Sequence, residues 1–281
     1  MKCSEILELD ELKKLVSIGT WSDEALTILL DGATDFLFSL LGHSFGRAIR
    51  IYHNEEEDAT VATVQVTAAA IVLVITGGAN AGTYTYNFST YSTLVSLVNV
   101  IEQADTGFVP TLVEGANPSE PSVNLHVVDA TNCLGLTNRQ VLCISQLTET
   151  FDGGEHMIFT SLPIQSVVSV LHDGETETDY WEKSAGYLIA KYSEGSQYSP
   201  YLMDFWSVKQ PCSVQVTYVP TFLRIPGVMK LIVKALCQHI MLDSSYASES
   251  IGDYSFSLGD FWGSIAPFWT MISQYSINFQ P

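Results

Sequence analysis

The chain has few basic residues, and its central stretch has none. It carries Lys+Arg 12 against Asp+Glu 31, a formal net charge of -19, and no Lys or Arg lies between Arg50 and Arg139. A surface this acidic repels phosphate backbones, which excludes a protein whose main role is to bind nucleic acid. The break in basic residues also predicts a domain inserted into a scaffold.

Charged residues of either sign are scarce as well. They make up 15% of the chain, and the mean hydropathy is +0.19, which is apolar for a soluble protein. We therefore expect part of the surface to be covered by partner subunits. The length of 281 residues favours about two domains over a single compact one.

The cysteines form no CxxC pair, and their odd number leaves at least one unpaired in any disulfide scheme. We expect reduced, partly buried thiols in a protein assembled in the cytoplasm. The N-terminus turns acidic at once and lacks the apolar core of a signal peptide, so no export is expected. The five cysteines are Cys3, Cys133, Cys143, Cys212 and Cys237.

Catalytic motifs are also missing. The chain has no HExxH, no GxSxG and no metal-spaced Cys/His cluster. The spacing from Gly77 to Gly82 mimics a phosphate-binding loop without its lysine, and the acids near Asp173 are interpreted as solvated loop residues. We interpret His43 as a helix-end cation and His239 as a core histidine. No catalytic residue, cofactor or metal ligand is predicted.

One uncharged run, residues 59–81, is long enough to span a bilayer. Val, Ile and Thr dominate it, it ends in two glycines, and no basic flank follows it. We therefore predict two adjacent strands at 61–67 and 71–76, and no membrane association.

Hydrophobic periodicity and turn residues predict the remaining elements. The N-terminal segment is helical, with one helix that begins at about Asp10 and stops before Gly19, and a second capped by Ser22 and ended by Gly42. The middle segment has a further helix capped by Ser89 or Thr90. Pro226 opens the last helix. Further strands are expected at 83–88, 109–113, 141–145, 162–170, 186–191 and 213–219.

The fold class is therefore α+β: a small helical bundle with an antiparallel β-sheet, interrupted by a β-rich α+β insertion. The N-terminal helical part of the scaffold spans 1–54, the acidic insert 55–149, and the strands and helix of the scaffold 150–252. An aromatic tail follows at 253–281. Because aromatic anchors with few charges suit an interface core, we predict that the tail binds a partner, or else packs on its own subunit. Its aromatic residues are Tyr254, Phe256, Phe261, Trp262, Phe268, Trp269, Tyr275 and Phe279.

Several short patterns occur outside the insert in a fixed order. They are ELKKLVSIG, WSDEALTILLDGATDFLFSLLGHSF, LPIQSVVSV followed by HDG and DY, GYLIA, VQVTYV with Pro226, and GDYSFS. Together they cover roughly residues 5–50 and 155–258, and this part of the chain resembles the head-tail connector (adaptor or head completion) proteins of tailed bacteriophages. The insert is not part of that pattern.

The resemblance implies a non-enzymatic virion protein of the phage neck. It implies a homo-oligomeric ring, dodecameric in form, that binds the portal protein and receives a tail or stopper protein. DNA would pass through the ring only as transient, non-specific cargo, repelled by an acidic channel. The C-terminal tail would bind the portal, and the insert would lie on the outside of the ring, where it could contact the capsid.

Two other functions remain open from the sequence. The insert could be a virion decoration module that binds the host surface or a glycan, because Tyr84, Tyr86 and Tyr91 are expected to be exposed beside Thr-rich strands. The other is an enzyme, for which loss of turnover on mutating His156 or Asp173 would be the evidence.

Overall fold

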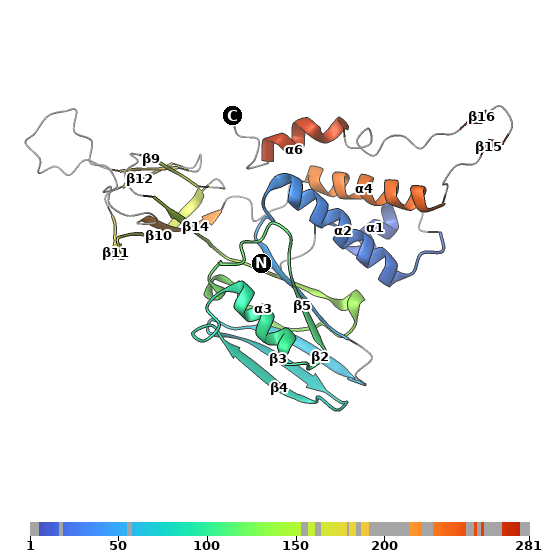
Figure 1. Cartoon of the computed structure of the whole chain (residues 1–281), viewed down its shortest axis with the longest axis horizontal. Coiled ribbons are helices and arrows are strands. Elements are labelled where there is room, and N and C mark those ends of the chain that lie inside the picture. The colour runs from blue at the N-terminus through green and yellow to red at the C-terminus, as the bar shows by residue number, and fades with distance from the viewer. Residues whose placement is uncertain are drawn as a thin grey trace, which may run out of the picture.

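The computed structural model describes residues 6–16, 19–54, 58–152, 157–160, 164–178, 180–183, 187–190, 214–220, 227–245, 250–251, 254–255 and 266–275. The architecture is mixed α+β with antiparallel sheets, as the sequence predicts at this level. Three groups of buried hydrophobic residues divide it into a helical unit, a middle α+β unit and a smaller β unit. In Figure 1 the helical unit lies at the upper right, the middle unit below it and the smaller β unit at the left.

The helical unit is built around the long helix α2 (Asp23–Leu41). The Ser22 side chain accepts a hydrogen bond from the Ala25 backbone N–H, and Gly42 ends the helix in the left-handed conformation at φ 77°. Both ends of α2 were therefore predicted correctly from the cap residues.

Segments from both ends of the chain share the core of the helical unit. Helix α1 (Leu9–Leu15), helix α4 (Gly227–Ser245) and helix α6 (Trp269–Tyr275), which the short helix η5 (Ala266–Phe268) precedes, pack with α2. Figure 1 shows α4 and α6 beside α2, although the middle unit and the third unit lie between α2 and these helices in the sequence. The fully buried core residues include Leu26, Leu37, Met229, Val233 and Ile272.

The middle unit joins two sheets and one helix. Strand β1 (Arg47–His53) is the central strand of a sheet with β5 (Phe108–Leu112) and β7 (Gln140–Cys143). Helix α3 (Leu94–Gln103) begins at a capping box formed by Thr93 and Ser96. The second sheet has the order β4-β3-β2-β6, formed by β2 (Val61–Val66), β3 (Ala70–Thr76), β4 (Gly82–Asn87) and β6 (Val128–Asn132).

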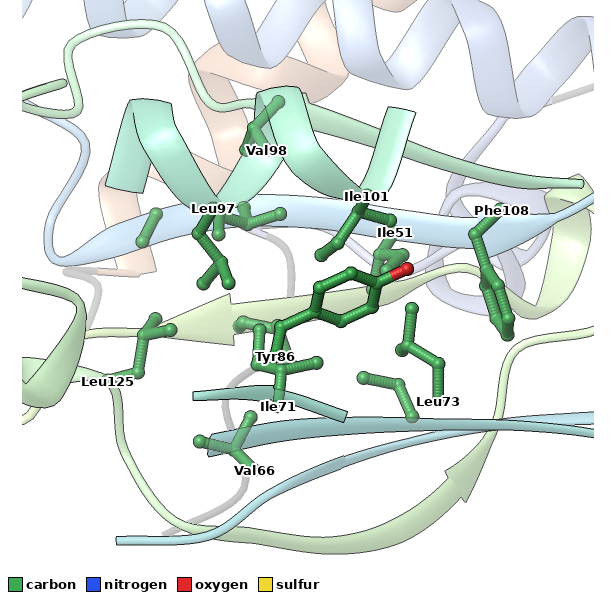
Figure 2. Close-up of a cluster of buried hydrophobic side chains, with 14 of the residues drawn as sticks. Ile51, Val66, Ile71, Leu73, Tyr86, Leu97, Val98, Ile101, Phe108 and Leu125 are labelled. Carbon is green, nitrogen blue, oxygen red and sulfur yellow. The ribbon is translucent and has the colours of Figure 1, made fainter. Parts of the chain in front are cut away.

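The core of the middle unit lies between these layers. Figure 2 shows Leu97 and Ile101 of α3 pointing toward Tyr86 and Leu73 of the second sheet, with Ile51 of β1 beside them. Short 3-10 helices, η2 (Ser122–Asn124) and η3 (Leu136–Asn138), connect the strands of this unit. Because Ala48, Ile49 and Ile51 of strand β1 belong to this core, the middle unit includes residues that precede position 54.

The third unit is a small β structure. One sheet has the order β11-β10-β14-β8, and another has the order β12-β13-β9. Asp173 and Gly174, with φ of 52° and 86°, form the turn between β10 and β11. The strands are β8 (Leu147–Phe151), β9 (Met157–Phe159), β10 (Ile164–His172), β11 (Glu175–Thr176), β12 (Tyr180–Lys183), β13 (Tyr187–Ala190) and β14 (Val214–Pro220), with the separate hairpin β15 (Ser250–Ile251) and β16 (Tyr254–Ser255).

The expected boundaries of the insert do not coincide with changes of hydrophobic core. Strand β1 precedes residue 54 yet pairs with β5 and β7, which lie within the expected insert. Strand β8 crosses residue 149 and pairs with β14 of the third unit. The change of core therefore falls near Gly46 on one side and near Gln146 on the other.

The apolar run 59–81 forms strands β2 and β3, which pair antiparallel from Val61 with Thr76 to Val66 with Ile71. The prediction of two strands is confirmed. In the part of the chain that the structure describes, no helix combines the length and apolarity needed to cross a membrane.

Three local predictions need correction. The cap of α3 is Thr93 rather than Ser89 or Thr90. Residues 47–53 form strand β1, where the sequence predicted no strand. Cys133 and Cys237 are free and buried, as expected, but Cys143 is disulfide-bonded. Without a CxxC spacing, such pairing depends on proximity in the fold that the sequence does not reveal.

Candidate functional site

A cavity lies where the three units meet. Its volume is about 260 Å³, and one water molecule takes up about 30 Å³ in the liquid. It therefore has room for a small organic group. Its walls come from the end of α2, the start of β1, the first turn of α3, the loop 115–120 and the link from β7 to β8.

Glu120 is the most deeply buried acid in this wall, with 1% of its surface exposed. Its Oε1 atom accepts hydrogen bonds from Asn124 Nδ2 at 2.7 Å and from the Thr148 backbone N–H at 3.0 Å. The Oε2 atom has no hydrogen-bond partner among the described residues. One carboxylate oxygen is therefore fixed by the fold, and the other is buried without a partner among the described residues.

Asn124 holds this arrangement together. Its Nδ2 also donates to Thr148 Oγ1 at 2.8 Å, and its Oδ1 accepts from Gln146 Nε2 at 2.6 Å. Thr148 Oγ1 in turn lies 3.1 Å from Thr217 Oγ1 on β14. The network thus connects the loop that carries Glu120 to the third unit.

The loop before Glu120 packs closely on the end of α2. Gly115 has φ of +73°, and a Cβ atom there would lie 3.0 Å from the carbonyl carbon of His43. A side chain at this position would be strained and would push the loop away. Gly115 therefore helps to hold the cavity wall against the helical unit.

Burial, with a smaller contribution from the nearby Glu149 carboxylate, raises the pKa of Glu120 to about 7. The hydrogen bonds from Asn124 and Thr148 lower the pKa, but the effect of burial is larger. Glu120 therefore changes its charge near neutral pH. Glu149, which also lines the cavity, accepts a hydrogen bond from the Tyr218 hydroxyl at 2.8 Å.

The cavity also has a basic side. Arg47, which is 5% exposed, donates from Nη1 to the Phe45 carbonyl at 2.7 Å. The Phe45 backbone N–H donates to His43 Nδ1 at 3.4 Å. Apolar side chains complete the lining, namely Ala48, Leu94, Ala116, Ile144 and Leu147. The described residues contain no group of three or more His, Cys, Asp or Glu side chains arranged to hold a metal ion.

A second polar cluster joins the helical unit to the middle unit. Asp31 of α2 lies 3.4 Å from Arg50 Nε and 2.5 Å from Arg139 Nη2. Arg50 Nη1 also donates to both oxygens of Asp35, at 2.8 and 2.9 Å. The two arginines that bound the basic-free stretch therefore meet at one helix.

The predicted aromatic interface is only partly described. Phe268 and Trp269 are half-buried and pack against the helical core beside the fully buried Ile272. These two residues follow the alternative in which the tail packs on its own subunit. Tyr254 lies in β16 and Tyr275 ends α6. The other four residues lie outside the described part of the chain: Phe256, Phe261, Trp262 and Phe279.

The tyrosines proposed for glycan binding differ in their exposure. Tyr86 is 7% exposed and belongs to the core of the middle unit, so the expectation that it is exposed is wrong. Tyr84 and Tyr91 are half-buried. In strand β4 the side chain of Tyr86 points inward, because alternate residues of a strand face opposite sides. His156, named for the enzyme hypothesis, lies outside the described residues.

The sequence did not single out Glu120, Asn124 or Arg47. Glu120 stands in an ordinary loop sequence, Asn117-Pro118-Ser119-Glu120, and its partner Thr148 is remote in the chain. No periodic pattern marks such a residue. The signal that could have drawn attention to the second cluster was the position of Arg50 and Arg139 at the two ends of the basic-free stretch.

The chain matches no protein-family model. No curated protein matches it at a significant level.

Proposed function

We propose that this chain is a structural protein of the bacteriophage neck, which forms an adaptor ring between the portal and the tail or stopper protein. The observation that carries the proposal is the shared core of the helical unit. Helices α1 and α2 precede the middle unit, helices α4 and α6 follow it, and all four pack together. A scaffold that closes around an insertion is what the resemblance to connector proteins implies.

Exposed apolar side chains on this helical unit support assembly into a ring. Ile28 of α2 and Leu231 of α4 are 62% and 53% exposed, and Leu15 of α1 and Ile240 of α4 are also exposed. Exposed apolar residues on a helical scaffold suit burial against neighbouring subunits. In the ring, adjacent copies cover these side chains.

The charge fits a channel for DNA. A formal net charge of -19 on each subunit creates a negative potential that grows with the number of subunits. The duplex is then repelled from the channel wall and passes as non-specific cargo during packaging and ejection.

The remaining parts of the chain have roles outside the channel. The C-terminal aromatic residues contact the portal, with Phe268 and Trp269 linking that contact to the helical core. The middle unit has its own hydrophobic core and lies on the outside of the ring, where it can contact the capsid. The assembled protein resides in the virion neck.

Native mass spectrometry of the purified protein, alone and mixed with its portal, tests the proposal. We expect a ring of defined stoichiometry that binds the portal. Substituting Ile28 and Leu231 together by Ser should weaken the ring without unfolding the subunit, because both side chains are exposed. A strictly monomeric chain that never binds the portal would contradict the proposal.

A further inference from the structure

We propose that the cavity beside Glu120 binds an alkylammonium group, that is, a primary amine carried on a short hydrocarbon stem. The site is distinct from ring assembly and does not require it. The acidic side of the cavity suits the ammonium, and its apolar side suits the hydrocarbon stem.

The Glu120 carboxylate supplies the polar end. Its Oε1 atom is fixed by Asn124 and Thr148, whereas Oε2 has no partner among the described residues although it is shielded from solvent. A buried carboxylate oxygen without a partner is costly. A primary ammonium has three N–H donors, so it can satisfy Oε2 and neutralise the charge at the same point.

The charges around the cavity favour a single positive charge. The ionisable groups that line it are the carboxylates of Glu120 and Glu149, the guanidinium of Arg47 and the imidazole of His43. Because His43 Nδ1 accepts a hydrogen bond from Phe45, we take this ring as neutral rather than as the helix-end cation expected from the sequence. With both carboxylates ionised the lining carries one net negative charge, which a monocation balances. A divalent cation would leave an excess positive charge beside Arg47.

The apolar wall accounts for the hydrocarbon stem. Leu94, Ile144 and Leu147 line the same cavity as Glu120. Long cationic side chains commonly lay their methylene groups along such surfaces while the charged end makes polar contacts. A bare inorganic ion would leave this wall without contacts, and the described residues hold no cluster of three metal-ligating side chains.

The occupant can be the lysine side chain of a partner protein or a free amine, since both present the same chemistry. The cavity lining favours an ammonium group on a hydrocarbon stem, whichever molecule carries it. A partner's lysine and a free diamine can be distinguished by comparing ligands that carry one ammonium group with ligands that carry two.

The test is thermal unfolding of the full-length chain at pH 8 with n-butylammonium chloride, at constant total chloride. We expect a saturable rise in melting temperature, and none with tetramethylammonium, which lacks N–H donors. Glu120→Gln should weaken binding about tenfold or more, because it removes a charged hydrogen-bond partner. Glu102→Gln, an exposed acid on α3, is the matched control and should bind as the wild type does.

Binding should also depend on pH. The ammonium binds the ionised form of Glu120, whose pKa of about 7 makes the affinity at pH 6 about tenfold weaker than at pH 8. If Glu120→Gln does not fold, the comparisons of two ligands and of two pH values on the wild type still decide the question.

Further ligands identify the source. A lysine analogue, Nα-acetyl-lysine methylamide, that binds at least as tightly as putrescine would point to a partner's lysine, and tighter binding of putrescine would point to a free diamine. The proposal is overturned if n-butylammonium has no saturable effect, if tetramethylammonium or Mg²⁺ stabilises equally well, or if Glu120→Gln responds like the wild type. None of these outcomes bears on whether the chain forms a ring.

Discussion

The burial of Glu120 makes the stability of the fold depend on pH. Its pKa rises from 4.5 to about 7 because folding buries the carboxyl group. The folded state therefore holds a proton that the unfolded state has released between these two values. This group stabilises the fold fully below pH 4.5, and the contribution is lost as the pH rises through 7.

The first prediction follows from this linkage. Glu120→Gln keeps the acceptor for Asn124 and Thr148 but cannot ionise. Between pH 5 and pH 8 the wild type should lose on the order of 2 kcal/mol more unfolding free energy than this variant. Urea unfolding at the two pH values measures the difference. Glu102→Gln should follow the wild type, and parallel pH curves for Glu120→Gln and wild type would contradict the role of burial.

The second feature at the scale of the residue is Asp31, which forms salt bridges with two buried arginines. The side chains of Arg50 and Arg139 are 6% and 9% exposed, whereas that of Asp31 is 24% exposed. Removing one partner from a mostly buried ion pair is more harmful than removing an exposed one, because the remaining charge stays desolvated.

Asp31→Asn should therefore destabilise the fold by about 1–3 kcal/mol. The exposed pair between Lys230 and Glu11, with exposures of 41% and 42%, supplies the control, and Lys230→Gln should cost at most about 1 kcal/mol. Chemical denaturation of both variants gives the comparison. Equal losses would show that the arginine cluster contributes no more than a surface pair.

At the scale of the element, helix α2 has one glycine in its interior and another directly after its last residue. Gly42 ends the helix at φ 77°, a conformation that is unfavourable for any residue with a Cβ atom. Gly32 lies inside the helix, and a Cβ atom built there meets nothing within 4 Å. Replacing each glycine by alanine therefore compares the same chemical change at a position that needs the left-handed conformation and at one that does not.

Gly42→Ala should destabilise the chain by about 1–2 kcal/mol, and Gly32→Ala should stabilise it by about 0.5–1 kcal/mol. Thermal unfolding of the two variants gives the signs directly. If both changes shifted the melting temperature in the same direction, the left-handed end of α2 would not be the reason that Gly42 is required.

The elements that local chemistry specifies were predictable from the sequence. Ser22 and Gly42 gave both ends of α2, and the alternation in β14 matches its alternating burial from Val214 to Pro220. Strand β1 escaped prediction because all but one of its residues are buried, Arg47 and Arg50 included. It therefore shows neither alternation nor an apolar run, the two signals by which strands are recognised.

The candidate site was less predictable than the fold. Glu120 accepts a hydrogen bond from the backbone of Thr148, which lies 28 residues away in the chain, so its surroundings are set by the fold. Such contacts between remote segments leave no local pattern. The meeting of Arg50 and Arg139 at Asp31 likewise depends on the antiparallel pairing of β1 with β7.

At the scale of the whole molecule, the arrangement of the cores defines where the middle unit can be removed. The Ile144 backbone N–H donates to the Gly46 carbonyl at 2.9 Å, so residues 46 and 144 are neighbours in space. Excising 47–143 removes β1 together with its partners β5 and β7. It leaves the helical core intact except for Val113 and the half-buried Ala116.

We predict that a chain lacking 47–143, closed by a short glycine linker, unfolds cooperatively and resists protease. Deleting 57–148 instead should give a less stable chain, because it leaves β1 without its neighbours and shortens β8. Circular dichroism during heating and limited proteolysis compare the two. A higher melting temperature for the 57–148 deletion would contradict the assignment of β1 to the middle unit.

The most direct measurement of the proposed function is an electron-microscopy average of the isolated neck complex. We predict a rotationally symmetric ring below the portal in which the helical units surround the channel, with extra density from the middle unit on the outside. The same ring without that outer density should form from the chain lacking 47–143. A neck that contains no ring of this protein, or a middle unit that lines the channel, would contradict the proposal.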